Sequence, residues 1–154
     1  MRNLSFMQLC AALCDETGMP APDLSPDDEG NTALAITVDD VEIVLSHEPR
    51  IAPDDALVAV TFGEVPSNDA LDVCRALMDV NSLMLWNHSC SFGRDASASE
   101  IVLQYAYPLP GGSAQDLYAR ICELAEIVQD WREHRFLSPT GSTLIGSIMR
   151  SGTC

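Results

Sequence analysis

The segment from Pro66 to Pro110 constrains the fold most, because it joins a long apolar helix to a short β-hairpin. The helix is expected over Ser67–Trp86, with Ser67 to Asp69 as N-cap residues. Its apolar residues lie on nearly every side: Leu71, Val73, Cys74, Leu77, Met78, Val80, Leu83, Met84, Leu85 and Trp86. A helix at the surface of one domain needs a single apolar stripe. We therefore expect a second copy of the chain to cover the remaining side, in an obligate homodimer.

The length and charge of the chain limit its function classes. It has 154 residues, of which 47% are hydrophobic, and this suits one domain with a core of its own. It carries 23 acidic and 8 basic residues, for a formal net charge of −15. Such a surface repels phosphate backbones, so nucleic-acid binding is not expected. It attracts basic proteins, and an acidic regulatory protein that sequesters a basic partner remains an alternative.

The N-terminal segment reads as an amphipathic helix over residues 4–16. Ser5 and Gln8 form a capping box, and Gly18 provides a stop. A signal peptide is not expected, because Gln8 interrupts the apolar run and Asp15-Glu16 stand where small residues are needed. No apolar run is long enough to span a membrane, and a cytoplasmic protein is expected.

Five strands are expected. After an acidic loop, strands at 33–38 and 41–48 alternate between apolar and polar residues and are joined by a tight turn at Asp39-Asp40. The next strand is expected at 56–65, and its nearly continuous apolar run from Ala56 to Phe62 suits a central strand. Two further strands, at 89–94 and 100–107, follow the long helix.

The last helix begins at Ser113, which with Asp116 has the spacing of a helix cap. Its single apolar stripe consists of Leu117, Ile121, Leu124, Val128 and Trp131. The order α-β-β-β-α-β-β-α predicts an α+β fold, in which a twisted and mainly antiparallel sheet of about five strands packs with three helices. Residues 1–136 form one domain in this interpretation, and residues 137–154 form a flexible C-terminal tail.

The sequence contains no pattern for catalysis or for a cofactor. No CxxC pair accompanies the six cysteines, so a metal site is not expected. His88 and Cys90 would share a strand face, but no third group that could orient a nucleophile is marked. No glycine-rich phosphate motif is present either. We therefore expect a binding protein rather than an enzyme, with no cofactor.

The element order and several segments resemble the class I chaperones of bacterial type III secretion systems, the Tir-chaperone-like family. The resemblance covers Leu4 to Phe136 and rests on the hairpin ITVDDVEIVL, the helix ALMDVNSLMLWN and the Leu-Pro pair before the last helix. It implies a homodimer that binds the N-terminal chaperone-binding region of an effector in extended form. The bound effector stays soluble and competent for secretion, and no nucleotide or metal takes part.

The resemblance also assigns two surfaces. The first helix and first strands form the effector grooves, for which we select Phe6, Met7, Cys10, Leu34, Ile36, Val38 and Ile43. The long helix and the following strand form the dimer interface, for which we select Cys74, Leu77, Met78, Val80, Met84 and Phe92. An unpaired edge strand can supply main-chain hydrogen bonds to an extended peptide. Binding of this kind should survive about 0.5 M salt, whereas charge-steered binding to a basic protein should weaken.

Overall fold

The computed structural model describes residues 4–65, 67–84 and 90–134 and has the expected order of elements. The elements are α1 (Phe6–Thr17), β1 (Thr32–Val38), β2 (Val41–His47), β3 (Asp55–Glu64), α2 (Ala70–Met84), β4 (Cys90–Asp95), β5 (Glu100–Pro108) and α3 (Ala114–His134). The predicted fold class is therefore confirmed. The predicted tail at residues 137–154 lies outside the described residues.

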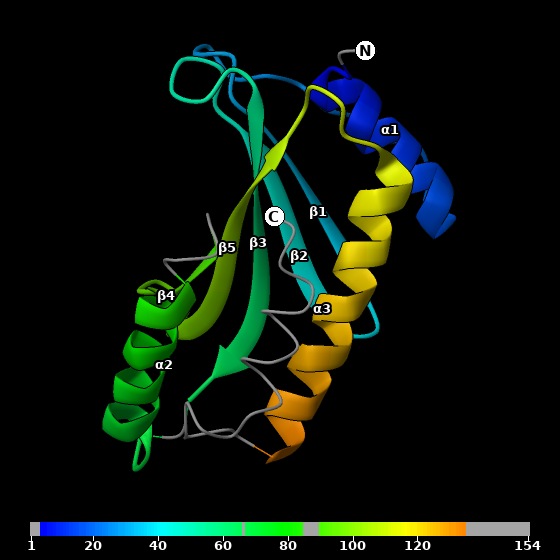
Figure 1. The fold of residues 1–154 in the computed structure, drawn as a ribbon. Helices are drawn as coiled ribbons and strands as arrows, with labels where there is room; N and C mark the ends of the chain where they lie inside the picture. Colours follow the sequence, from blue (N-terminus) through cyan, green and yellow to red (C-terminus); the bar gives the residue numbers. More distant parts are fainter. Residues whose placement is uncertain (1–3, 66, 85–89, 135–154) are drawn as a thin grey trace.

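The five strands form one antiparallel sheet in the order β1-β2-β3-β5-β4 (Figure 1). β3 lies at the centre, as its apolar run predicted, and pairs with β5 along most of its length. A bulge between Thr61 and Gly63 interrupts this pairing. The edges of the sheet are β1 and β4, which are far apart in the sequence and in space.

The predicted caps of α1 and the predicted turn are confirmed. The Ser5 N–H donates to the Gln8 side chain at 3.0 Å, and the Gln8 N–H donates to the Ser5 hydroxyl at 3.3 Å. Gly18 ends α1 with a φ of 70°, where glycine is favoured. Asp39 and Asp40 both have positive φ, as a two-residue hairpin turn of type I′ requires.

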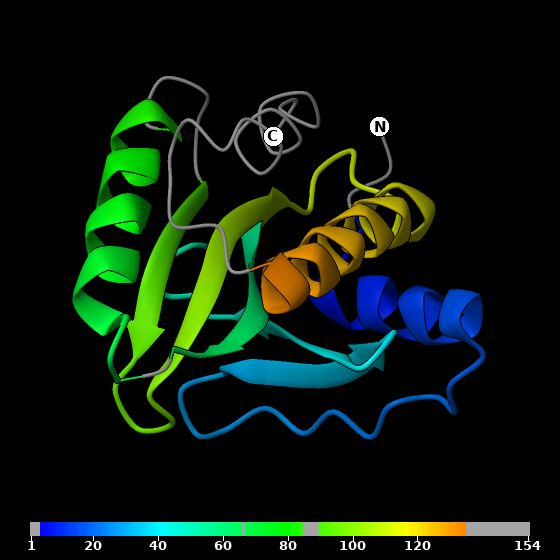
Figure 2. The same cartoon turned by 90° about the horizontal axis from the view of Figure 1, so that it is seen from below.

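The core lies between one face of the sheet and the helices α1 and α3, which run side by side across it (Figure 2). The whole predicted stripe of α3 is buried there. The Phe62 ring stands edge-on to Phe92 and to Trp131, with centroid distances of 5.1 and 5.7 Å. This cluster joins β3, β4 and α3. α2 lies beside β4, beyond the edge of the sheet (Figure 2).

The C-terminal end of α3 is fastened to the β1–β2 hairpin. The Arg132 guanidinium donates to the carbonyls of Phe62 at 2.8 Å, Asp40 at 2.9 Å and Thr61 at 3.2 Å. The Gln129 amide donates to the carbonyl of Asp39, in the same turn. These bonds hold the hairpin, and with it the β1 edge, at a fixed position on the helical layer. None of the described helices is long and apolar enough to cross a membrane.

Candidate partner-binding surfaces

The second face of the sheet carries no described helix and forms an open face. The cross-strand register places its side chains in rows, such as Ala35 beside Val44 and Val44 beside Ala59. Most of its exposed or half-buried side chains are uncharged: Ala33, Ala35, Thr37, Val44, Ser46, Leu57, Ala59, Thr61, Val102, Gln104 and Ala106. The charged side chains at outward positions lie toward the strand ends: Glu42 opposite Thr37, Asp55 at the start of β3 and Glu100 at the start of β5. An antiparallel sheet with one face in water normally carries polar residues there. In a chain with a net charge of −15, a face whose centre is uncharged and largely apolar indicates a binding surface.

A shallow pocket of about 240 Å³ lies at one end of this open face. Ile51 in the β2–β3 loop is 79% exposed beside it, and Leu57 on β3 is 42% exposed. Ala52 and Ala106 complete the apolar part of the lining. Ser46, Glu48 and Asp55 form the polar part of the lining. The mostly apolar pocket has the size to receive one aliphatic side chain of a partner. The alternation of β3 could have indicated Leu57, but nothing in the sequence indicated Ile51.

The β1 edge borders the open face. In a two-residue hairpin the flanking pair, here Val38 and Val41, is hydrogen-bonded, and hydrogen-bonded pairs then alternate along the strands. The residues whose N–H and C=O groups point away from β2 are therefore Ala33, Ala35 and Thr37. Within the described part of the chain, these groups make no hydrogen bond to a loop or side chain. They can accept an added strand.

The residues selected for the effector grooves fall mostly in the core. Met7 on α1 is 44% exposed. The other six are buried between the sheet and the helices: Phe6, Cys10, Leu34, Ile36, Val38 and Ile43. The side chains of β1 that face outward are those at the positions between the selected ones, such as Ala35. The role of the selected residues in effector binding stays a prediction, and in this structure only Met7 offers an exposed side chain for it.

The residues selected for the dimer interface divide in the same way. Met78 is 69% exposed, and Cys74 is half-buried. Leu71, one turn before Cys74, is 62% exposed and extends the same stripe of α2. The remaining selected residues are buried in the core of the protomer: Leu77, Val80, Met84 and Phe92.

The outward side of α2 is more polar than the all-round apolar helix that the sequence suggested. Asp72, Arg75 and Asp79 are exposed between the apolar positions. Trp86, which the expected helix included, lies outside the described residues, as does Leu85. Among the side chains that the structure describes, the outward apolar surface of α2 consists of Leu71, Cys74 and Met78.

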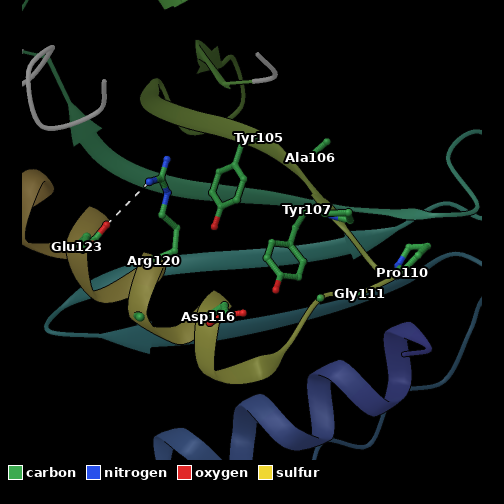
Figure 3. Close-up of a pocket in the computed structure, with 11 residues that line it drawn as sticks. Tyr105, Ala106, Tyr107, Pro110, Gly111, Asp116, Arg120 and Glu123 are labelled. Atoms are coloured by element: carbon green, nitrogen blue, oxygen red, sulfur yellow. Dashed lines mark ion pairs between the residues drawn. The ribbon is translucent and has the colours of Figure 1, made fainter. Parts of the chain in front are cut away.

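A larger pocket, of about 430 Å³, lies between the end of β5 and the N-terminal half of α3 (Figure 3). Its lining includes both apolar and polar side chains. Among the polar ones, Arg120 pairs with Glu123 at 3.9 Å, and the hydroxyl of Tyr107 bonds to Ser113. The Tyr107 hydroxyl donates to the Ser113 carbonyl and accepts from the Ser113 N–H, both at 2.9 Å. Burial raises the pKa of Tyr107 above its ordinary value. These polar groups are engaged with one another and fix the entry into α3.

The described residues offer no metal centre and one strongly protected thiol. No three histidine, cysteine or acidic side chains among them are grouped to hold a metal ion. Burial raises the pKa of Cys10 to about 12, and the neighbouring Cys14 adds to this effect. A thiol with this pKa is a poor nucleophile. Cys90 is half-buried, and His88, which was considered with it, lies outside the described residues.

Comparison with solved structures identifies the same fold in chaperone complexes. The first is the ExsC–ExsE complex, with a TM-score of 0.60 and 20% identity, covering 86% of this chain and 93% of that one. The complex of the HopA1 effector with its chaperone SchA has a TM-score of 0.58 and 18% sequence identity, and the match covers 85% of this chain and 95% of that one. The Yersinia pestis type III secretion chaperone SycH, bound to a fragment of YscM2, has a TM-score of 0.56 and 14% sequence identity. The match covers 82% of this chain and 98% of that one.

The model of the Tir chaperone protein (CesT) family matches residues 8–132. The match runs from the first turn of α1 almost to the end of α3, and therefore includes both the open face and the β1 edge. The chain belongs to this family. A search of curated protein sequences finds no match.

Proposed function

We propose that this chain is a type III secretion chaperone, which binds the N-terminal segment of an effector in extended form and keeps it soluble until export. The observation that carries the proposal is the largely uncharged centre of the open face, which continues into the unpaired edge of β1. An extended segment can add to β1 through main-chain hydrogen bonds, while its alternate side chains cover the open face. The family membership supports the same role, which is binding in the bacterial cytoplasm without a catalytic step or a cofactor.

The geometry of β1 explains how such a segment is held. The outward N–H and C=O groups of Ala33, Ala35 and Thr37 provide affinity without regard to sequence. Selectivity then comes from the side chains that reach the open face, where the pocket beside Ile51 and Leu57 receives an aliphatic group. Ordering a disordered segment costs free energy, so a large contact area is needed. The open face extends across four strands and provides that area.

We further propose that two copies associate through the outward surface of α2. Leu71, Cys74 and Met78 stand on consecutive turns, so a second copy can cover them with the same residues across a two-fold axis. Met78→Glu should convert the dimer into a folded monomer, measured by sedimentation at micromolar concentration. Leu77→Glu is the contrasting variant, because it places a charge in the core of the protomer and should unfold the chain. A Met78→Glu protein that remains a dimer would contradict this interface.

The effector proposal is tested by purifying the chain from its native cell and identifying the bound protein by mass spectrometry. The N-terminal segment of that protein is then titrated against Ala59→Asp, which places a carboxylate at the centre of the open face. We expect the affinity to fall at least about tenfold, because the buried charge has no partner. Ala96→Asp, in the exposed β4–β5 turn, is the matched control and should bind as the unmodified chain does.

Two outcomes would contradict the proposal. One is unchanged affinity of the folded Ala59→Asp protein for the captured segment. The other is binding that disappears in about 0.5 M salt, which would favour the sequestration of a basic protein through charge.

A further inference from the structure

The loop between β2 and β3 is braced by its own backbone. The N–H groups of Ile51 and Ala52 both donate to the Glu48 carbonyl at 2.9 Å. The His47 ring lies 3.2 Å from the Pro53 carbonyl, within hydrogen-bonding distance. These contacts restrain the loop at the end of the sheet where β3 begins (Figure 1). The wall that this loop gives to the pocket on the open face is therefore formed before a partner binds.

The braced loop presents an aliphatic side chain to solvent. Among the described residues, Ile51 is the most exposed large hydrophobic residue, at 79%. It lines the 240 Å³ pocket together with Leu57 and Ala106, which belong to two neighbouring strands of the sheet. An aliphatic side chain that enters this pocket removes apolar surface from water on both partners. The pocket thus has the properties of an anchor site.

Two carboxylates line the same pocket. Glu48 is exposed in the loop, and Asp55 is half-buried at the start of β3. Within the part of the chain that the structure describes, neither forms an ion pair. The Arg50 guanidinium of the same loop pairs instead with Glu29, at 3.8 Å. A cation carried by a partner would therefore meet two negative charges beside an apolar pocket.

The spacing of an extended segment relates the apolar and the charged parts of the pocket. Alternate residues of such a segment point to the same side and stand about 6.8 Å apart. When one side chain fills the pocket, the side chain two positions away lies beside it. Arginine and lysine can lay their methylene groups on apolar surface and extend the charged end toward carboxylates. A basic residue at that position would contact Glu48 and Asp55.

We propose that this pocket selects, within the effector segment, an aliphatic residue that has an arginine or lysine two positions away. The inference rests on the proposed function and adds the side-chain pattern that the bound segment carries. Main-chain hydrogen bonds to β1 permit the segment to shift by two residues. One aliphatic anchor with a basic neighbour fixes a single register.

The experiment uses a displayed library of random peptides about 12 residues long, which span roughly 40 Å when extended. It is selected on the unmodified chain and on the double variant Glu48→Gln/Asp55→Asn, which keeps the size of both side chains and removes their charges. The unmodified chain should enrich peptides with isoleucine, leucine or valine two positions from arginine or lysine. The double variant should keep the aliphatic preference and lose the basic one. Ile51→Ser should weaken the aliphatic preference instead.

A selected peptide is then titrated by calorimetry. Its affinity should fall about tenfold for the double variant and about threefold for Glu48→Gln or Asp55→Asn alone, and the single variants serve if the double variant does not fold. Glutamine in place of the basic residue of the peptide should weaken binding to the unmodified chain and change nothing further on the double variant. Glu64→Gln is the matched control, because it removes the same charge at the opposite end of β3. It should leave selection and affinity unchanged.

The inference is overturned if the enriched peptides carry no basic residue at that spacing, or if a folded double variant keeps the basic preference. Either result leaves the effector proposal standing, because aliphatic peptides still bind the chain. It is also overturned if no peptide is enriched. The effector proposal is decided separately, by Ala59→Asp and the segment captured from the native cell.

Discussion

The two faces of the sheet use the same strands and differ in what covers them. On β3, Val58, Val60 and Phe62 point inward and are fully buried, whereas Leu57 and Ala59 point outward. The inner face holds large side chains that interlock with α1 and α3. The centre of the outer face holds uncharged and mostly apolar side chains, although folding alone would permit charged residues there. The inner face therefore accounts for the stability of the chain, and the outer face is left available for a partner.

The comparison of the two faces is tested most strongly by placing a carboxylate on each face, at adjacent positions of β1. Ile36→Asp introduces a carboxylate at a site that is 1% exposed, and it should cost at least about 4 kcal/mol of unfolding free energy or prevent folding. Ala35→Asp points outward and should cost less than about 1 kcal/mol. Urea denaturation followed by circular dichroism measures both. Similar costs for the two variants would show that the faces are wrongly assigned.

A second comparison removes apolar volume from each face. Phe62→Ala deletes the ring that contacts Phe92 and Trp131, and it should lower the free energy of unfolding by about 3–5 kcal/mol. Leu57→Ala removes a half-exposed side chain from the open face and should cost less than about 1 kcal/mol. The same denaturation assay applies. If Leu57→Ala proves as costly as Phe62→Ala, the chain itself must cover the open face.

The smallest expected effect concerns Cys10, which is buried on the inner side of the sheet. It should make the free energy of unfolding depend on pH in the alkaline range. Burial raises the pKa of Cys10 from 9.0 to about 12, so the folded state holds this proton more tightly than the unfolded state. The group therefore leaves stability unchanged below about pH 9 and lowers it as the pH rises toward 12. At pH 8 a thiol reagent should modify half-buried Cys90 much faster than Cys10. Equal rates would show that α1 does not seal the inner face.

The local parts of the fold could be predicted because they depend on near neighbours. The capping box of Ser5 and Gln8, the turn at Asp39-Asp40 and the stripe of α3 are all set within a few residues. The alternation of β1 and β2 also gave the residues that share a face. It could not say which face the helices would cover, since both faces of an alternating strand have the same period. For this reason Ile36 and Ile43 were selected for a groove and lie in the core.

The remaining features depend on contacts between distant parts of the chain. The pairing of β3 with β5 and the bulge at Gly63 join segments about 40 residues apart. The two hydrogen bonds between the Asn81 side chain and the Phe92 backbone depend on how α2 lies against the sheet edge. Nothing in the local sequence marks Ile51 as a pocket residue. Such features become visible only when the elements are placed in space.

The central claim is that an extended segment of an effector adds to the β1 edge and covers the open face. The most direct test is residue-by-residue amide exchange of the chain with and without its captured partner. In the free chain, the amides of Ala33, Ala35 and Thr37 should exchange rapidly, and those of Leu34, Ile36 and Val38 slowly. Partner binding should slow the first set and leave the second almost unchanged. Protection that appears elsewhere, with rapid exchange still present at Ala35, would contradict the account.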